Sequence, residues 1–69
     1  MIHTFVLTTD YIELNKLLKF YNLVENGAQA KKVITDGLVT VNGHQELRIR
    51  NKLVAGDKVQ YNNQEIVIE

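Results

Sequence analysis

The sequence of 69 residues contains no cysteine and no proline, and its charges sum to zero. Without cysteine, no disulfide can cross-link the chain and no thiolate can bind zinc or act as a nucleophile. Eight basic and eight acidic residues cancel, which argues against a strongly cationic domain that would coat any nucleic acid. The hydrophobic fraction of 45% is that of a globular protein, so we expect one small packed domain over residues 1–69.

Long hydrophobic runs are also missing. The run over residues 1–7 is too short for a membrane span or a secretory signal, lacks a basic leader, and is interrupted by His3 and Thr4. We therefore expect a cytoplasmic protein that has no membrane partner.

The sequence offers few groups for catalysis or metal binding. His3 and His44 are its only histidines, and they lie far apart without a metal-ligand spacing. The acidic residues are scattered, so no carboxylate pair suggests an acid and a base, and neither a phosphate-binding loop nor a nucleophile elbow is present. We expect two surface histidines and a protein that is not an enzyme, with no metal, no cofactor and no small-molecule substrate.

The first part of the chain predicts an edge strand over residues 2–7 and then a helix. The segment DYIE (residues 10–13) has the pattern of a capping box, in which the Asp10 and Glu13 side chains bond to each other's backbone N–H. Ile12 and Phe20 lie off the helix's apolar stripe, so this helix is expected to contact the core on more than one side. The stripe itself consists of Leu14, Leu17, Leu18 and Tyr21.

A second helix is predicted to begin after Asn26, a good N-cap residue, with Gln29 completing another capping box. Its buried face consists of Ala30, Val33 and Ile34. Gly37 is predicted to end the helix in the left-handed conformation, which would place Leu38 against Val33 in a Schellman motif.

From Leu38 onward the pattern predicts antiparallel strands joined by tight turns. Asn42-Gly43 is a strong hairpin signal, and its return strand is expected over residues 46–50. Further turns are predicted at residues 55–57 and 62–63, and strands at residues 58–61 and 65–68. The predicted order β-α-α-β-β-β-β describes a small α+β domain.

The basic residues are the strongest candidates for binding. If residues 46–52 are extended, Arg48, Arg50 and Lys52 share one face, which suits phosphate because arginine can donate two parallel hydrogen bonds. The second helix adds its positive N-terminus, Lys31 and Lys32, with the amides of Asn26 and Gln29 beside them. On the first helix, Lys16 and Lys19 point away from the apolar stripe.

Spacing alone leaves open that these charges are simply the solvated faces of a sheet and a helix. The aromatic residues do not favour binding, because Tyr11, Phe20 and Tyr21 are expected in or at the edge of the core. The sequence therefore predicts no aromatic platform for stacking nucleotide bases.

Several motifs in order resemble the S-four RNA-binding domain, named after ribosomal small-subunit protein four and also called the alpha-L motif. They are NGAQAK (residues 26–31), ITDGLVTVNG (residues 34–43) and GDKV (residues 56–59). YIELNKLLKF (residues 11–20) and ELRIRNK (residues 46–52) are similar to small stand-alone bacterial members of the YaaA/YbcJ type. The resemblance covers residues 5–68.

The resemblance implies two helices packed on a small bent antiparallel sheet, with structured RNA bound across the helices and the adjoining loop. The positions that match the family's contacts are Lys19, Asn26, Gln29, Lys31, Arg48, Arg50 and Lys52, with Lys32 a weaker addition. Two departures predict modest affinity: Gly27 and Thr40 stand where the family often has a basic residue.

We therefore expect a non-catalytic module that binds structured RNA, such as ribosomal RNA or a ribosome-assembly intermediate. A protein-interaction module of the same fold with little RNA affinity is the alternative. A ubiquitin-like sulfur carrier is not expected, because the chain ends in IVIE (residues 66–69) instead of the Gly-Gly that such carriers need.

Overall fold

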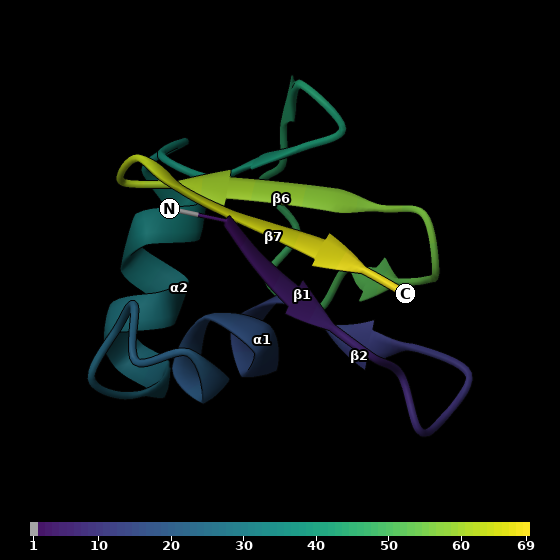
Figure 1. The fold of residues 1–69 in the computed structure, drawn as a ribbon. Coiled ribbons are helices and arrows are strands. Elements are labelled where there is room, and N and C mark those ends of the chain that lie inside the picture. The colour runs from purple at the N-terminus through teal and green to yellow at the C-terminus, as the bar shows by residue number, and fades with distance from the viewer. Residues whose placement is uncertain (1) are drawn as a thin grey trace.

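Two helices lie against a mixed sheet in the computed structural model, which describes residues 2–69 (Figure 1). Because the chain is short, most of its elements are short as well. In chain order they are β1 (Ile2–Phe5), β2 (Ile12–Glu13), α1 (Leu14–Phe20), α2 (Gly27–Thr35), β3 (Thr40–Val41), β4 (His44–Gln45), β5 (Lys52–Leu53), β6 (Lys58–Tyr61) and β7 (Gln64–Ile68).

The main sheet has the strand order β1-β7-β6-β3-β4, so β1 is an edge strand as predicted. Its pairing with β7 is parallel, whereas every other pair in this sheet is antiparallel. The expected all-antiparallel sheet is therefore corrected to a mixed one, within the α+β fold that was predicted. A parallel pair needs a long crossover, and here everything between residues 5 and 64 supplies it.

A second, two-stranded sheet pairs β2 with β5 and was not predicted. Its presence explains why the first predicted capping box is wrong. Residues 12 and 13 are extended in β2, so α1 begins only at Leu14, and Glu13 makes no side-chain capping bond.

The core forms between the helices and one face of the sheet, and the predicted apolar faces of both helices are buried. Tyr21, directly after α1, is half-buried and donates a hydrogen bond of 2.8 Å from its hydroxyl to the carbonyl of Thr4. The expectation for Phe20 is wrong, since 64% of this residue is exposed. Neither helix of the described chain is long and apolar enough to cross a membrane.

Helix α2 begins and ends as its sequence predicts. The Asn26 side chain accepts a hydrogen bond of 2.9 Å from the N–H of Gln29. At the other end, Gly37 has φ +78°, and the N–H groups of Gly37 and Leu38 donate to the carbonyls of Ile34 and Val33, both at 3.0 Å. These two bonds define the Schellman motif.

Both predicted asparagine turns are confirmed. Asn42 and Gly43 have φ of 54° and 83°, and Asn62 and Asn63 have φ of 52° and 64°, which are the left-handed values that tight hairpins need. The return strand after the first turn is β4 (His44–Gln45), which lies before the predicted residues 46–50.

Residues 46–50 do not form the predicted strand. The Glu46 carboxylate accepts a bond of 3.0 Å from the Arg48 N–H, and the Asn51 N–H donates to the Arg48 carbonyl at 3.2 Å. These local bonds replace strand pairing and fold the segment into a loop.

The C-terminus of α2 provides a stability test. Gly37→Ala should cost roughly 1–2 kcal/mol of stability because alanine disfavours the left-handed backbone at this position. The loss should be larger still, because the new methyl group would collide with the Gln45 amide, which donates a hydrogen bond to the Gly37 carbonyl. Urea unfolding measures the difference. Gly43→Ala is the matched control: it carries the same backbone strain and meets no atom within 4 Å. Equal losses in the two variants would contradict the proposed collision.

Candidate nucleic-acid interface

The loop of residues 46–51 is fixed to the start of α1 by two backbone hydrogen bonds. The N–H of Leu14 donates to the carbonyl of Asn51 at 2.9 Å, and the N–H of Asn15 donates to the carbonyl of Ile49 at 3.1 Å. Backbone carbonyls thus perform the capping role that the sequence assigned to Asp10. The half-buried Ile49 packs against the core, and the two arginines on either side of it remain exposed.

The sequence predicted that Arg48, Arg50 and Lys52 share a face because they lie on one strand. That reason is wrong, since these residues are not on one strand. The structure nevertheless brings them together, because with Asn51 they line an open concavity of about 410 Å³. We call Arg48, Arg50 and Lys52 the loop cluster.

Each member of the loop cluster has a different environment. Arg48 forms a two-pronged ion pair with Glu46, with its Nε 2.9 Å from Oε1 and its Nη2 3.2 Å from Oε2. This hydrogen bonding holds the pKa of Glu46 below its ordinary value and raises the pKa of Arg48. The ammonium of Lys52 lies over the Tyr11 ring, 4.9 Å from its centroid. Arg50 forms no ion pair within residues 2–69.

A second group of polar side chains lies at the start of α2. Asn26 caps the helix with its side-chain oxygen, and the side-chain oxygen of Gln29 accepts from the N–H of Glu25, at 2.6 Å, instead of from Asn26 as a capping box requires. Because both amide oxygens are engaged in these bonds, the amide nitrogens are the groups that remain available to a ligand. They are donors, which suits phosphate oxygens.

Lys19 reaches the same place from α1. Its Nζ lies 3.9 Å from the position that a Cβ on Gly27 would take. Lys31 is exposed and is in no ion pair with any described residue. We call Lys19, Asn26, Gln29 and Lys31 the helix cluster. Lys32 is different, because its ammonium pairs with Asp36 at 3.2 Å.

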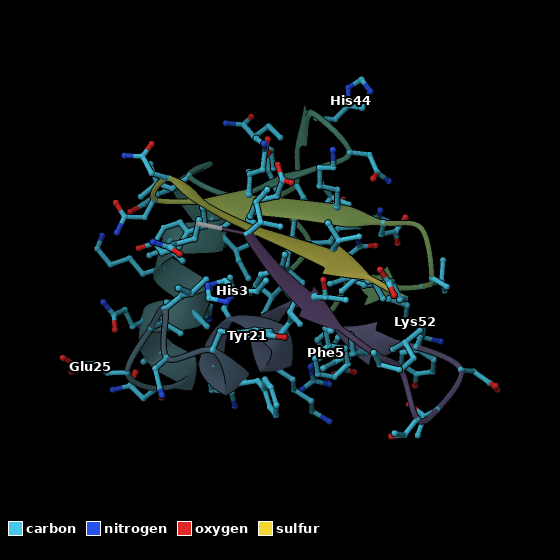
Figure 2. The ribbon with its side chains drawn as sticks, viewed as in Figure 1. His3, Phe5, Tyr21, Glu25, His44 and Lys52 are labelled. Atoms are coloured by element: carbon cyan, nitrogen blue, oxygen red, sulfur yellow. The ribbon has the colours of Figure 1, made fainter. Side chains whose placement is uncertain are left out.

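The predicted residues therefore form two clusters, one at each end of α1. The helix has seven residues, so its ends are about 10 Å apart. In Figure 2, Lys52 of the loop cluster and Glu25 beside the helix cluster lie on opposite sides of the view. A ligand that contacts both clusters must offer anionic groups on the order of 10 Å apart.

Two further residues lie at this candidate surface: Lys16, which the sequence placed on the outward side of the first helix, and Glu46, whose role the sequence did not reveal. Lys16 lies on α1 between the clusters and pairs with Glu13 at 3.7 Å. Glu46 forms an ion pair with Arg48. A prediction of residues 46–50 as a strand gives no reason to expect this pair, so the sequence did not indicate it.

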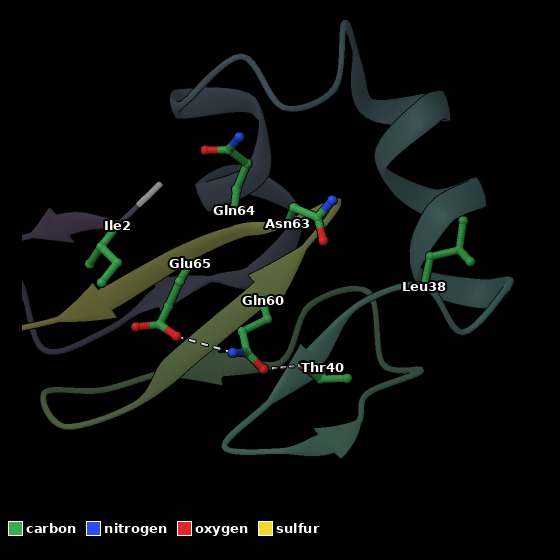
Figure 3. A pocket seen from close by; sticks show the side chains of 7 residues that line it. All are labelled: Ile2, Leu38, Thr40, Gln60, Asn63, Gln64 and Glu65. Atoms are coloured by element: carbon green, nitrogen blue, oxygen red, sulfur yellow. Dashed lines mark hydrogen bonds between the residues drawn. The ribbon is translucent and has the colours of Figure 1, made fainter.

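A larger concavity than that of the loop cluster, about 530 Å³, lies elsewhere and does not suit an anion (Figure 3). It lies on the sheet face away from the helices, where Thr40, Gln60 and Glu65 form a chain of hydrogen bonds of 3.3 and 3.0 Å. Its lining contains a carboxylate and no basic side chain: Ile2, Leu38, Thr40, Gln60, Asn63, Gln64 and Glu65.

The helix pair, the sheet and the cationic loop define an S4 domain, and the model of that family matches residues 5–69. The chain belongs to the S4 domain family. This is the family that the sequence motifs indicated.

Two curated relatives show the same likeness. The "Putative RNA-binding protein YbcJ" of Escherichia coli is 47% identical over 51 residues, which cover 74% of this chain and 73% of YbcJ. YbcJ of Shigella flexneri matches with the same identity and coverage. The solution structure of Escherichia coli YbcJ, described as revealing an αL motif involved in RNA binding, superposes with a TM-score of 0.70. It is 41% identical, and the match covers 94% of this chain and 84% of that one.

The Glu46–Arg48 pair predicts a pH dependence of stability. Because the pKa of Glu46 is lowered on folding, its contribution is present above the ordinary carboxyl pKa of about 4.3 and is lost as the pH falls through the lower folded value. Wild type should therefore be more stable than Glu46→Gln at pH 7, and the difference should shrink below about pH 4. Urea unfolding at both pH values measures this. Glu25→Gln, which removes a carboxylate in no ion pair among the described residues, should show no such change.

Proposed function

We propose that this protein is a non-catalytic, cytoplasmic module that binds structured RNA through phosphate groups. The observation that carries the proposal is the pair of cationic clusters at the two ends of α1 in a chain of the S4 domain family. Its relatives add support, because the name of one and the structural description of the other refer to RNA binding.

The fixed geometry of the clusters favours folded RNA over a flexible strand. Two backbone bonds hold the 46–51 loop on α1, and the capped start of α2 places Asn26, Gln29 and Lys31. Backbone positions defined in this way suit phosphates whose spacing is already set by the RNA's own fold. A-form RNA hides its base edges in a deep groove, so contacts to phosphates, ribose hydroxyls and shape should dominate.

Ribosomal RNA or a ribosome-assembly intermediate is the class of RNA that we propose. The support is the family itself, which takes its name from a ribosomal protein. Crosslinking the protein to RNA in cells and sequencing the bound fragments tests this class directly. Recovery of mostly non-ribosomal fragments would contradict it, while leaving RNA binding itself intact.

The affinity should be modest. Glu46 and Asp36 already neutralise Arg48 and Lys32, and RNA has to compete with both carboxylates. Exposed ion pairs contribute little stability, so they can be displaced, yet each lowers the net attraction for phosphate.

Removing single cations should weaken binding and its dependence on salt. Lys31→Ala, Arg48→Ala and Arg50→Ala should each lower the affinity for a structured RNA and reduce the slope of log K against log salt by roughly one unit or less. Titration at several salt concentrations measures both quantities. Lys58→Ala is the control, because Lys58 is exposed on the sheet face away from the helices. If all three variants match wild type, the proposed interface is wrong.

Restoring a cation at Gly27 should strengthen binding. A Cβ at this exposed position would meet the Lys19 ammonium at an ordinary contact distance of 3.9 Å, so adding a side chain here causes no clash at its Cβ. Gly27→Arg should raise the affinity for structured RNA and steepen the salt slope by up to about one unit. Gly27→Gln is the control of similar length without charge. Equal affinities for the Arg and Gln variants would show that position 27 does not face the RNA.

One experiment distinguishes a protein partner from RNA. Affinity capture from a lysate, with and without complete nuclease digestion, separates the two. Loss of the captured material on digestion supports RNA as the ligand, and retention of a defined protein partner contradicts it.

A further inference from the structure

The exposed ring of Phe20 is the feature of this surface that phosphate binding does not explain. Phe20 ends α1, and 64% of the residue is exposed. Its ring meets Phe5 edge-to-face, with centroids 5.2 Å apart and planes at 89°, and meets Tyr21 at 5.0 Å and 79°. These contacts support the ring from the β1 side and leave most of it accessible.

The rings that support Phe20 are themselves fixed to the sheet. The Tyr21 hydroxyl donates to the Thr4 carbonyl in β1. His3 lies 4.8 Å from Tyr21, centroid to centroid, and its Nε2 is 3.2 Å from the side-chain oxygen of Gln64 in β7. Figure 2 shows His3, Phe5 and Tyr21 gathered between β1 and α1. Phe20 is therefore held in position before any ligand arrives, which lowers the entropy lost on binding.

Two exposed cations belong to the same helix as the exposed ring. Lys19 is the preceding residue and reaches toward the start of α2. Lys16 lies one turn earlier on the same side, and its side chain is 64% exposed despite the pair with Glu13. An exposed apolar ring in a helix that also carries two exposed cations suits a group that combines an aromatic face with a neighbouring negative charge.

We propose that Phe20 stacks on an unpaired base of the bound RNA, next to the phosphates held by the helix cluster. A nucleotide has the required combination, because its base offers an apolar π-face and its phosphate offers the charge. The inference rests on the proposed RNA binding and narrows it to structured RNA with an unpaired nucleotide. It differs from the sequence-based expectation that the chain has no stacking platform.

Two hairpin RNAs of equal stem length test the inference, one fully paired and one with a single bulged 2-aminopurine. Wild type should bind the bulged hairpin more tightly and quench its fluorescence by stacking. Phe20→Ala and Phe20→Leu should lose about 5- to 150-fold in affinity for the bulged hairpin only. Phe20→Trp should retain both the affinity and the quenching. The Leu variant keeps an apolar side chain, so it separates stacking from simple hydrophobic contact.

Leu38→Ala is the matched control, because Leu38 is 55% exposed and lines the concavity on the other face of the sheet. It should bind both hairpins as wild type does. Equal binding of the bulged hairpin by wild type and the Ala and Leu variants would overturn the inference while leaving phosphate binding in place. An equal loss on both hairpins would also overturn it. Failure of wild type to bind either hairpin would overturn the proposed function as well.

Discussion

The docking of the 46–51 loop on the first turn of α1 is the constraint on which the rest of the structure depends. A helix of seven residues is too short to be stable alone, and this one has no side-chain cap. The carbonyls of Ile49 and Asn51 satisfy its first two N–H groups. The same two bonds fix the loop cluster, so the helix start and the cationic loop are one structural unit.

Local features could be predicted from the sequence, and non-local ones could not. The cap at Asn26, the stop at Gly37 and the two asparagine turns depend on residues within a few positions of each other, and all are confirmed. The parallel β1–β7 pair and the β2–β5 pair join residues far apart in sequence, and the hydrophobic pattern carries no strand direction. The loop over residues 46–50 was not predicted, because its alternating charges have the pattern of a strand. Its conformation depends instead on a hydrogen bond from the Arg48 N–H to the Glu46 side chain.

The same division applies to the binding surface. The family motifs identified its candidate residues, but their environments depend on the fold. In the sequence, Arg48 and Arg50 look alike, as do Lys31 and Lys32. In the structure, of these four residues only Arg48 and Lys32 are paired with carboxylates. Phe20 was misplaced because a seven-residue helix has few positions to bury, and its leucines fill them. A neutral chain can thus present a cationic surface, whose positive charge depends on which cations are already paired with carboxylates.

The parallel pairing of β1 with β7 has a consequence for the order in which the chain can fold. The N–H of Leu7 bonds the carbonyl of Glu69, and the N–H of Glu69 bonds the carbonyl of Phe5. During synthesis β1 cannot pair with β7, its neighbour in the described sheet, until residues 64–68 have left the ribosome. Such pairing across nearly the whole chain is slow to form. Phe5, which is part of the aromatic support beneath Phe20, is therefore fixed in the sheet only when β1 and β7 pair.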